Sequence, residues 1–459
     1  MNQSDLFHQL NFLIIFGPGT CKFARALPGD DELNRRKLLT SAIPAGIAGA
    51  LLPASSHAQA TDSKKSAARE VRATPIGLTG NAAAAAYFSQ ERLQQVLGTK
   101  ELSAPRDVTV IAFNFPSWHP SPYMEEHFGK GWTEFDTLRN SRPLFPGHTM
   151  PHFPLWGYYD ESDPVWAARE IDLASTYGVD AWMIDWYWHD GVQFYQEQLE
   201  RGLLKAPNRD KLKFAIMWAN HDWKNVYPAR SPDDAAILLP QRHSVQDFER
   251  VCNYCAEHYF SQPNYLTFDG APVFGIFDAG KVVDQLGEDG LRRSLAVMRE
   301  RAHKLGFPKL HLQVCNGFSK YQGRLRDLGF DSAVQYGTFG WTYGSKPPGS
   351  RIPYGVGASE AVASWPALRN DLQVPFHPTC SVGWDDSPRF GEFSSVAINR
   401  TPDQFERLVR AARHFVSSSP HQKLIYLNAW NEWTEDGVLL PDSYWGYSYL
   451  EALRRAVKD

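Results

Sequence analysis

Short apolar segments alternate with longer segments of helical periodicity from about residue 105 to the C-terminus. Eight of the short segments are rich in β-branched and aromatic residues and have the length of buried strands. These predicted strands are Val108–Phe115, Val179–Trp186, Leu212–Trp218, Pro272–Asp278, Leu310–Cys315, Ser332–Tyr336, Phe376–Val382 and Lys423–Ala429. The predicted helices include Pro164–Tyr177, Gly290–Leu305, Thr401–Val416 and Tyr447–Val457.

Strands that alternate with helices pair in parallel, and eight such units predict an α/β fold with a single (β/α)8 TIM-type barrel. An open, doubly wound sheet is the alternative. The nucleotide-binding versions of that fold carry a G-x-G-x-x-G or G-x-x-x-x-G-K-[ST] segment after a strand, and no predicted strand here is followed by one. The pattern therefore favours the barrel.

The N-terminal segment has the features of an export signal. Asn34–Leu39 reads NRRKLL, an apolar stretch runs from Leu38 to Leu52, and Ala58-Gln59-Ala60 is a small-x-small cleavage site. The apolar stretch is shorter than the ~20 residues that span a bilayer, so an uncleaved membrane anchor is the alternative and not the prediction. We expect residues 1–60 to be a twin-arginine leader and the mature protein, without a membrane span, to be periplasmic or secreted.

Three segments are therefore expected along the chain. After the leader, residues 61–104 are predicted to form a polar linker and an N-terminal helix near Ala82 to Leu97. The barrel is predicted to occupy residues 105–459.

The charge balance and the aromatic content indicate which class of molecule the protein binds. The chain has 47 Lys and Arg against 51 Asp and Glu, a formal net charge of −4, so nothing marks the protein as a binder of nucleic acid or an anionic membrane. Its 15 Trp and 19 Tyr favour a carbohydrate partner, because flat aromatic rings stack on sugar rings, although core packing is the alternative interpretation. An oligosaccharide or polysaccharide substrate is expected, and the oligomeric state is left open.

The cysteines indicate neither a cofactor nor a metal. Cys252 and Cys255 form a C-x-x-C pair inside a predicted helix, Val245–Tyr259, whereas redox pairs open a helix after a strand. A zinc site needs two further ligands that the sequence does not place. The pair is interpreted as two buried cysteines or a disulfide that forms late, and no cofactor is expected.

Polar and aromatic residues cluster where the predicted strands end. In (β/α)8 barrels the active site lies at the C-terminal ends of the strands. Five such clusters follow predicted strands, at Pro116–Pro120, Asp185–Asp190, Trp218–Trp223, Gly383–Arg389 and Trp430–Glu435. We expect them to form one polar cleft lined by tryptophan, which suits sugar recognition.

Glu432 and Glu435 are the predicted catalytic pair. Glycoside cleavage requires a proton donor for the leaving oxygen and a second carboxylate, and these two glutamates are three positions apart at a strand end. Trp430 and Trp433 are expected to restrict water and raise the pKa of one carboxyl. The alternative is that one glutamate only caps or pairs with the following loop.

Several motifs resemble those of a known family. Gly129–Glu134 reads GKGWTE, Gly157–Asp160 reads GYYD, Gly383-Trp384-Asp385 precedes Arg389, and Asn428–Glu435 reads NAWNEWTE. In this order they resemble the WbsX-like family, a relative of glycoside hydrolase family 99, whose members are endo-α-mannosidase-like.

The resemblance implies a (β/α)8 barrel and retaining hydrolysis of an α-linked glycan. It assigns Glu432 to the substrate 2-hydroxyl, through a 1,2-anhydro intermediate, and Glu435 to protonation of the leaving group and activation of water. One departure concerns the sugar, because the family's W-A-N-E-N-W segment reads WANHDW at Trp218–Trp223. The sugar, the linkage and endo against exo action are left open.

The motifs and clusters together give a set of candidate substrate-binding residues. They are His119, Glu134, Tyr159, Asp185, Trp218, Asn220, Trp384, Asp385, Arg389, Trp430, Asn431 and Trp433. Asp185 is alternatively a structural hydrogen-bonding group, and Asp385 with Arg389 is alternatively an ion pair that fixes a loop.

A metal cluster of His189, Asp190 and His221 is the alternative to a site without metal. These residues come from two loops without ligand-type spacing, so no metal is predicted.

Two other functions fit the same residues. One is a glycosyltransferase or transglycosylase of surface-polysaccharide metabolism, and the other is a carbohydrate-binding barrel without catalysis. The predicted export signal argues against a transferase that uses a cytoplasmic sugar nucleotide. The presence of both Glu432 and Glu435 argues against a carbohydrate-binding barrel without catalysis. The sequence therefore predicts an exported glycoside hydrolase.

Overall fold

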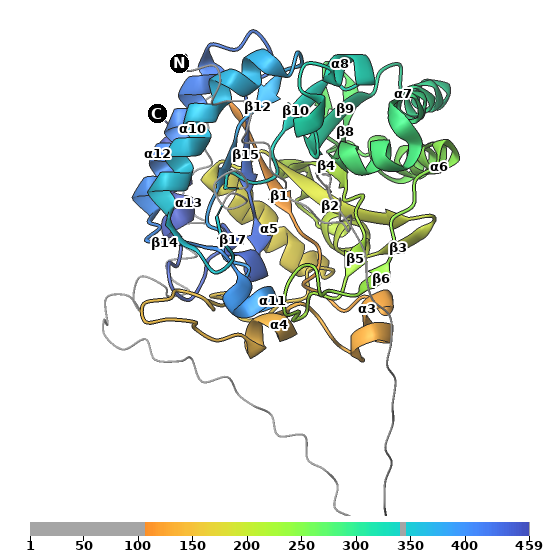
Figure 1. Ribbon diagram of the computed structural model, residues 1–459. Helices are drawn as coiled ribbons and strands as arrows, with labels where there is room; N and C mark the ends of the chain where they lie inside the picture. Colours follow the sequence, from red (N-terminus) through yellow and green to blue (C-terminus); the bar gives the residue numbers. More distant parts are fainter. Residues whose placement is uncertain (1–105, 340–345, 459) are drawn as a thin grey trace, which may run out of the picture. The chain divides into compact units, whose positions relative to one another are not determined.

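The computed structural model describes residues 106–339 and 346–458 (Figure 1). The predicted leader at 1–60 and the predicted linker and helix at 61–104 lie outside the described residues, so both stay predictions. The described residues belong to one compact unit. No helix within them is long and apolar enough to cross a membrane.

The centre of the fold is a ring of parallel strands. In the described part of the chain its order is β12-β10-β9-β8-β4-β2-β1-β15-β13, and each neighbouring pair runs parallel. The strands are β1 Thr109–Asn114, β2 Ala181–His189, β4 Lys213–Trp218, β8 Ala271–Asp278, β9 His311–Asn316, β10 Ser332–Val334, β12 Phe376–His377, β13 Thr379–Ser381 and β15 Leu424–Asn428.

The ring closes through one stretch of chain. β12 pairs with β10 and β13 pairs with β15, and only Pro378 separates β12 from β13. Proline has no N–H for a sheet hydrogen bond, which accounts for the interruption. The eight predicted strands are therefore confirmed, the seventh as two short pieces, and so is the α/β barrel.

Helices cover the outside of the ring (Figure 1). The longer ones are α5 Pro164–Tyr177, α6 Val245–Cys255, α7 Ala279–Lys304, α10 Tyr354–Asp371, α12 Pro402–Ser417 and α13 Ser448–Lys458. Local sequence sets their limits: α5 begins where the Asp163 carboxylate accepts a hydrogen bond from Val165 N, and it ends at Gly178 with a left-handed φ of 94°. Four predicted helices are confirmed, but α7 starts eleven residues before the predicted Gly290 and contains a break at Gly287.

Short elements gather at the carboxyl ends of the strands. They include α3 Pro122–Phe128, α4 Phe135–Asn140, α11 Ser387–Phe390 and the 3₁₀ turn η7 Trp433–Glu435. Figure 1 shows α4 and α11 side by side, and both contact η7. This end of the barrel therefore brings together segments that are far apart in sequence.

The second strand extends beyond the ring. β2 continues to His189 and turns back as the antiparallel strand β3 Val192–Phe194. The segment Asp185–Asp190, expected as a loop cluster, is thus largely strand, and its side chains alternate between two faces. Trp186 and Trp188 contact Tyr254 of α6, whereas Asp185 reaches across the barrel to Tyr336.

Candidate active site

The last barrel strand leads into a tight hairpin that carries both predicted catalytic residues. β16 Asn431–Glu432 pairs antiparallel with β17 Gly437–Val438, and η7 lies between them. Asp436 ends the turn with a left-handed φ of 57°. Glycine at 383 allows the turn to pack closely, because a Cβ there would lie 2.6 Å from the Asp436 carbonyl oxygen.

Asn431 fastens this hairpin to the first strand of the barrel. Its Oδ1 accepts a hydrogen bond from Phe115 N at 2.8 Å, and its Nδ2 donates to Phe115 O at 2.9 Å. Since both ends of the amide bind backbone, Asn431 holds the hairpin to the end of β1, and its role as a substrate ligand stays a prediction.

Arg389 brings three carboxylates together. Its Nε and Nη2 donate to Glu134 Oε1 at 2.9 and 2.7 Å, and Nη2 also lies 3.4 Å from Glu432 Oε2. Its Nη1 forms an ion pair with Glu435. One guanidinium is therefore shared by Glu134, Glu432 and Glu435, which we call the carboxylate cluster.

Glu134 is the most firmly held member of the cluster. It is completely buried, and Ser117 Oγ donates to its Oε2 at 3.0 Å. The Thr434 hydroxyl donates to its Oε1. Because Thr434 lies between the two predicted catalytic residues in sequence, Glu134 also fixes the turn that presents them.

Burial and mutual repulsion raise the pKa of both predicted catalytic carboxyls. Burial raises the pKa of Glu432 well above its ordinary value, and the neighbouring Glu435 raises it further, whereas Arg389 opposes the rise. Burial also raises the pKa of Glu435, against the lowering effect of Arg389. The charge on either carboxyl therefore opposes ionisation of the other, which favours a state with one proton on the pair.

Tyr336 connects a fourth carboxyl to the cluster. Its hydroxyl oxygen lies 2.9 Å from Asp185 Oδ2 and 3.0 Å from Glu432 Oε1. Asp185 is in β2 and Tyr336 follows β10, which are not neighbours in the ring, so this contact crosses the barrel interior. Asp185, a predicted site residue, is therefore joined to Glu432.

Tyrosines rather than tryptophans surround the carboxylate cluster. Burial raises the pKa of Tyr187 and of Tyr227, the charge of Glu134 raises both further, and the charge of Arg389 lowers both. Tyr227 contacts the half-buried ring of Trp132 at 5.1 Å between centroids. Sequence reasoning missed Tyr187, Tyr227 and Tyr336.

Signals for two of these three tyrosines were present in the sequence. Tyr187 has the same strand face as Asp185, two positions away, and Tyr336 ends a predicted strand. Tyr227 lies in the irregular segment after β5 Trp223–Lys224, and no pattern marks it.

Four predicted substrate-binding aromatic residues lie elsewhere. Trp430 Nε1 donates to Glu170 of α5 at 3.2 Å, and Trp218 packs on Phe248 of α6 at 5.1 Å. Trp433 donates to the Tyr159 hydroxyl at 2.9 Å, and Tyr159 stacks on Trp166 of α5. Their contacts are therefore with residues outside the carboxylate cluster, and a role of Tyr159, Trp218, Trp430 and Trp433 in substrate binding stays a prediction.

Two other predicted ligands are engaged by protein groups. His119 lies between Glu161 (3.1 Å) and Glu197 (3.3 Å); burial lowers and the two glutamates raise its pKa, with a net rise to about 9. Asn220 ties β4 to the end of β8 through both backbone groups of Asp278. Both residues therefore belong to the walls that support the site.

Asp385 and Trp384 are the last two residues of the predicted set. Asp385 Oδ2 lies 2.5 Å from His148 Nε2 and its Oδ1 accepts from Ser387 N, so its ion-pair partner is His148 and not Arg389, the partner considered as the alternative to a sugar contact. Trp384 is half-buried, and its role stays a prediction. The structure thus brings together Glu134, Asp185, Arg389, Glu432 and Glu435.

The histidines and cysteines considered as metal or redox groups make structural contacts. His189 Nε2 lies 3.0 Å from the His221 carbonyl oxygen, and burial lowers the pKa of His189 to about 4. Within residues 106–339 and 346–458, no group of three His, Cys, Asp or Glu is arranged to hold a metal ion. Cys252 and Cys255 are buried in α6 as free thiols, and burial raises the pKa of Cys252 to about 12.

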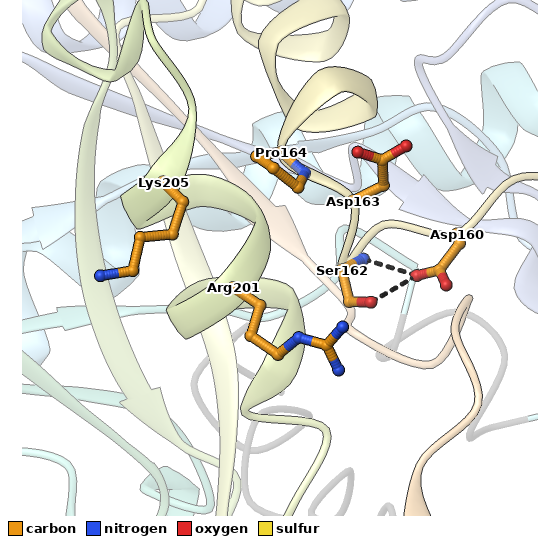
Figure 2. A pocket seen from close by; sticks show the side chains of 6 residues that line it. All are labelled: Asp160, Ser162, Asp163, Pro164, Arg201 and Lys205. Atoms are coloured by element: carbon orange, nitrogen blue, oxygen red, sulfur yellow. Dashed lines mark hydrogen bonds between the residues drawn. The ribbon is translucent and has the colours of Figure 1, made fainter.

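A separate pocket of about 420 Å³ opens at the start of α5 (Figure 2). It is lined by Asp160, Ser162, Asp163, Pro164, Arg201 and Lys205. Asp160 Oδ1 accepts hydrogen bonds from Ser162 N at 2.9 Å and from Ser162 Oγ at 2.6 Å, as Figure 2 shows. These six residues differ from those of the carboxylate cluster.

Comparisons with known proteins place the chain in a family. The model of the family described as "Glycosyltransferase WbsX" matches residues 110–453. Two curated relatives, each named "Uncharacterized protein WxcX", come from strains of Xanthomonas campestris pv. campestris. They are 27% and 28% identical over 377 and 367 residues, which is 78% and 76% of this chain. The chain spans about half the length of these relatives, 51% and 49%.

Two solved structures share the barrel at low similarity. The endo-α-mannosidase of glycoside hydrolase family 99 from Bacteroides thetaiotaomicron has 15% identity and a TM-score of 0.48, covering 77% of this chain and 96% of that one. A "Glycoside hydrolase-like protein" also has 15% identity and a TM-score of 0.48, covering 80% and 99%. At this level of similarity neither structure decides the reaction.

Proposed function

Because this chain belongs to the WbsX glycosyltransferase family, we propose that its partner is a glycan and that it acts as a retaining glycoside hydrolase on an α-linked chain. The observation that carries the proposal is the carboxylate cluster, in which Glu432 and Glu435 share the Arg389 guanidinium. Two carboxyls that differ in environment are what acid/base cleavage of a glycosidic bond requires.

The environments of the two glutamates suit different roles. Glu435 has 15% of its side chain exposed and Glu432 has 4%, so Glu435 is the more accessible to a leaving oxygen and to water. Glu432 is held on one oxygen by Tyr336 and on the other by Arg389. In the proposed reaction Glu435 is the general acid and Glu432 is the base.

Both steps balance without a protein nucleophile. In the first, Glu432 takes the proton of the substrate 2-hydroxyl, that oxygen bonds to C1, and the leaving oxygen departs with the proton of Glu435. In the second, Glu435 takes a proton from water, the water oxygen bonds to C1 as the bond between C1 and the 2-oxygen breaks, and Glu432 returns its proton to the 2-oxygen. Each glutamate ends in its starting state, and two displacements at C1 retain the configuration.

The assay is a panel of α-linked polysaccharides, headed by α-mannans, followed by chromatography of the released sugars. We expect Glu432→Gln and Glu435→Gln each to lower turnover by at least ~100-fold. On a glycosyl fluoride, whose leaving group needs no proton, the first step of Glu435→Gln is expected to lose far less, whereas its second step still lacks the base that activates water. Glu257→Gln, an exposed glutamate on the π turn Ala256–Phe260, is the matched control. Full activity of either active-site variant would contradict the assignment.

A glycosyltransferase is the second candidate, because the family description names that activity. A transferase needs an activated donor, whereas a hydrolase needs only the glycan and water. Incubation with a panel of sugar nucleotides separates the two: transfer that depends on a nucleotide donor would exclude the hydrolase proposal.

Export through the twin-arginine route is part of the same proposal. It rests on the Asn34–Leu39 segment and the Ala58-Gln59-Ala60 site. Replacing Arg35 and Arg36 together by Lys is expected to retain the protein inside the cell, as measured by fractionation. Equal export of the variant would exclude this route.

A further inference from the structure

Tyr336 lies between two carboxyl groups but carries a single hydroxyl hydrogen. Its oxygen is 2.9 Å from Asp185 Oδ2 and 3.0 Å from Glu432 Oε1, both hydrogen-bond distances. A phenol donates one hydrogen bond and accepts others. One of the two contacts is therefore donated by the phenol, and the other requires a hydrogen on the carboxyl that faces it.

The surroundings of Asp185 and Glu432 differ, and the difference indicates which of the two carboxyls carries this hydrogen. Glu432 also faces the Arg389 guanidinium, at 3.4 Å, which favours its ionised form against the opposing effects of burial and of Glu435. Asp185 is 4% exposed; its Oδ1 has no hydrogen-bond partner among the described residues, and the Tyr336 hydroxyl is the one partner of its Oδ2. A buried carboxylate without a cation or a second donor costs far more free energy than a buried carboxylic acid.

We propose that Asp185 is a carboxylic acid in the working enzyme, and that it donates its hydrogen to Tyr336 so that Tyr336 donates to Glu432. Asp185 is then a positioning residue: it acts on Glu432 through Tyr336 and keeps the phenol hydrogen directed at that carboxylate. Its role in catalysis rests on the proposed function, but its protonation does not.

The charges around Asp185 agree with this assignment. Glu435 and Glu432 face it from the hairpin after β15, Tyr336 from the end of β10, Tyr187 from its own strand and Cys315 from β9. None of these groups is a cation. Arg389 is the cation of the cluster and is already shared by three carboxylates, so a fourth negative charge at Asp185 would have no counterpart.

The direct test is infrared difference spectroscopy of the purified protein at pH 7, with wild type compared against Asp185→Asn. The carbonyl stretch of a protonated carboxyl is separate from the bands of carboxylates. We expect a wild-type band of this kind that is missing in Asp185→Asn and kept in Asp233→Asn, an exposed aspartate. Should Asp185→Asn not fold, as judged by near-ultraviolet circular dichroism, Asp185→Ser serves the same comparison. An unchanged band would overturn the proposal.

The functional test uses the pH profile of glycan cleavage. The amide of Asp185→Asn still donates to Tyr336, so this variant is expected to keep more of the wild-type kcat at neutral pH than Asp185→Ala, and its activity should extend to higher pH. Asp185→Ala lacks the donor and is expected to lose at least about tenfold in kcat with little change in KM. In a Tyr336→Phe background the Asn and Ala variants should be equal, because the link to Glu432 is gone.

The outcomes separate this inference from the proposed function. If the infrared band is found but the protein cleaves no glycan, Asp185 is protonated and the hydrolase proposal fails. If the protein cleaves glycan but the infrared band is unchanged in Asp185→Asn, the hydrolase proposal holds and the protonation of Asp185 is refuted. A loss of ~100-fold or more in Asp185→Asn would show that the ionised carboxylate is required, which also overturns it.

Discussion

Glu170 of α5 tests whether burial raises the pKa of a carboxyl group enough to make protein stability depend on pH. Its side chain in α5 is buried between two indoles, with Trp166 Nε1 at 2.5 Å from Oε1 and Trp430 Nε1 at 3.2 Å from Oε2. Burial, with a contribution from Glu161, raises its pKa from 4.5 to about 8, against the lowering effect of the two indole hydrogen bonds. At neutral pH this residue is therefore a carboxylic acid.

The sign of the pH dependence follows from proton counting. Between pH 4.5 and about 8 the folded state keeps a proton on Glu170 that the unfolded chain releases. The free energy of unfolding therefore falls as the pH rises, by about 1.4 kcal/mol per pH unit from this group. The contribution is fully present below pH 4.5 and is lost as the pH approaches the folded value.

Glu170→Gln removes this titration. At pH 5.5 the variant is expected to be less stable than wild type by about 1–3 kcal/mol, because its amide N–H₂ must face one indole N–H. Between pH 5.5 and 7.5 wild type loses about 2.7 kcal/mol through Glu170 that the variant does not lose. The difference between them should therefore close or reverse by pH 7.5.

The free energy of unfolding is measured by urea unfolding, followed by tryptophan fluorescence at pH 5.5 and 7.5. The slope of this free energy against urea concentration is compared between the proteins. Other titrating groups are common to both proteins and cancel. Glu257→Gln, an exposed glutamate, should show a small difference that does not vary with pH. A constant difference between Glu170→Gln and wild type would refute the reasoning.

Three further predictions concern the site and its walls. Arg389→Met leaves buried carboxylates unpaired, so we expect a loss of about 3–5 kcal/mol in the free energy of unfolding, and thermal denaturation that shows no loss would contradict the ion cluster. His119, with a pKa of about 9, stabilises the fold fully below pH 6.5 and loses this contribution as the pH rises through 9; histidine NMR should find one ring that titrates near 9, and its absence from His119→Gln identifies it. Trp132→Ala removes a half-buried ring beside Tyr227, and we expect KM for long glycans to rise up to about tenfold with kcat kept, whereas an equal fall in kcat would place the ring at the reacting sugar.

The strands of the barrel were predictable because each is an apolar segment bounded by turn residues. The seventh segment was predicted as one strand, and the structure interrupts it only at Pro378, where proline removes a ladder hydrogen bond. The cluster partners Glu134 and Arg389 were predicted from motifs. Their ion pair joins positions 255 residues apart, and no local pattern specifies such a pair.

The direction of the aromatic side chains was not predictable. In β2 the run Asp185-Trp186-Tyr187-Trp188 puts aromatic rings on both faces, so hydrophobicity does not reveal which face is the barrel interior. The same ambiguity affected Trp430 and Trp433, whose indole groups donate hydrogen bonds to Glu170 and Tyr159 and not to the carboxylate cluster. A register shift of one residue would have exchanged the two sets.

The central claim is that Glu432 and Glu435 act as one unit within the carboxylate cluster. Its most direct test is kcat/KM on the cleaved α-glycan for Glu432→Gln, Glu435→Gln and the double variant. Residues that act together lose activity non-additively, so we predict that the double variant is no worse than the more damaging single change. Losses that multiply in the double variant, or a single variant with wild-type activity, would contradict the account.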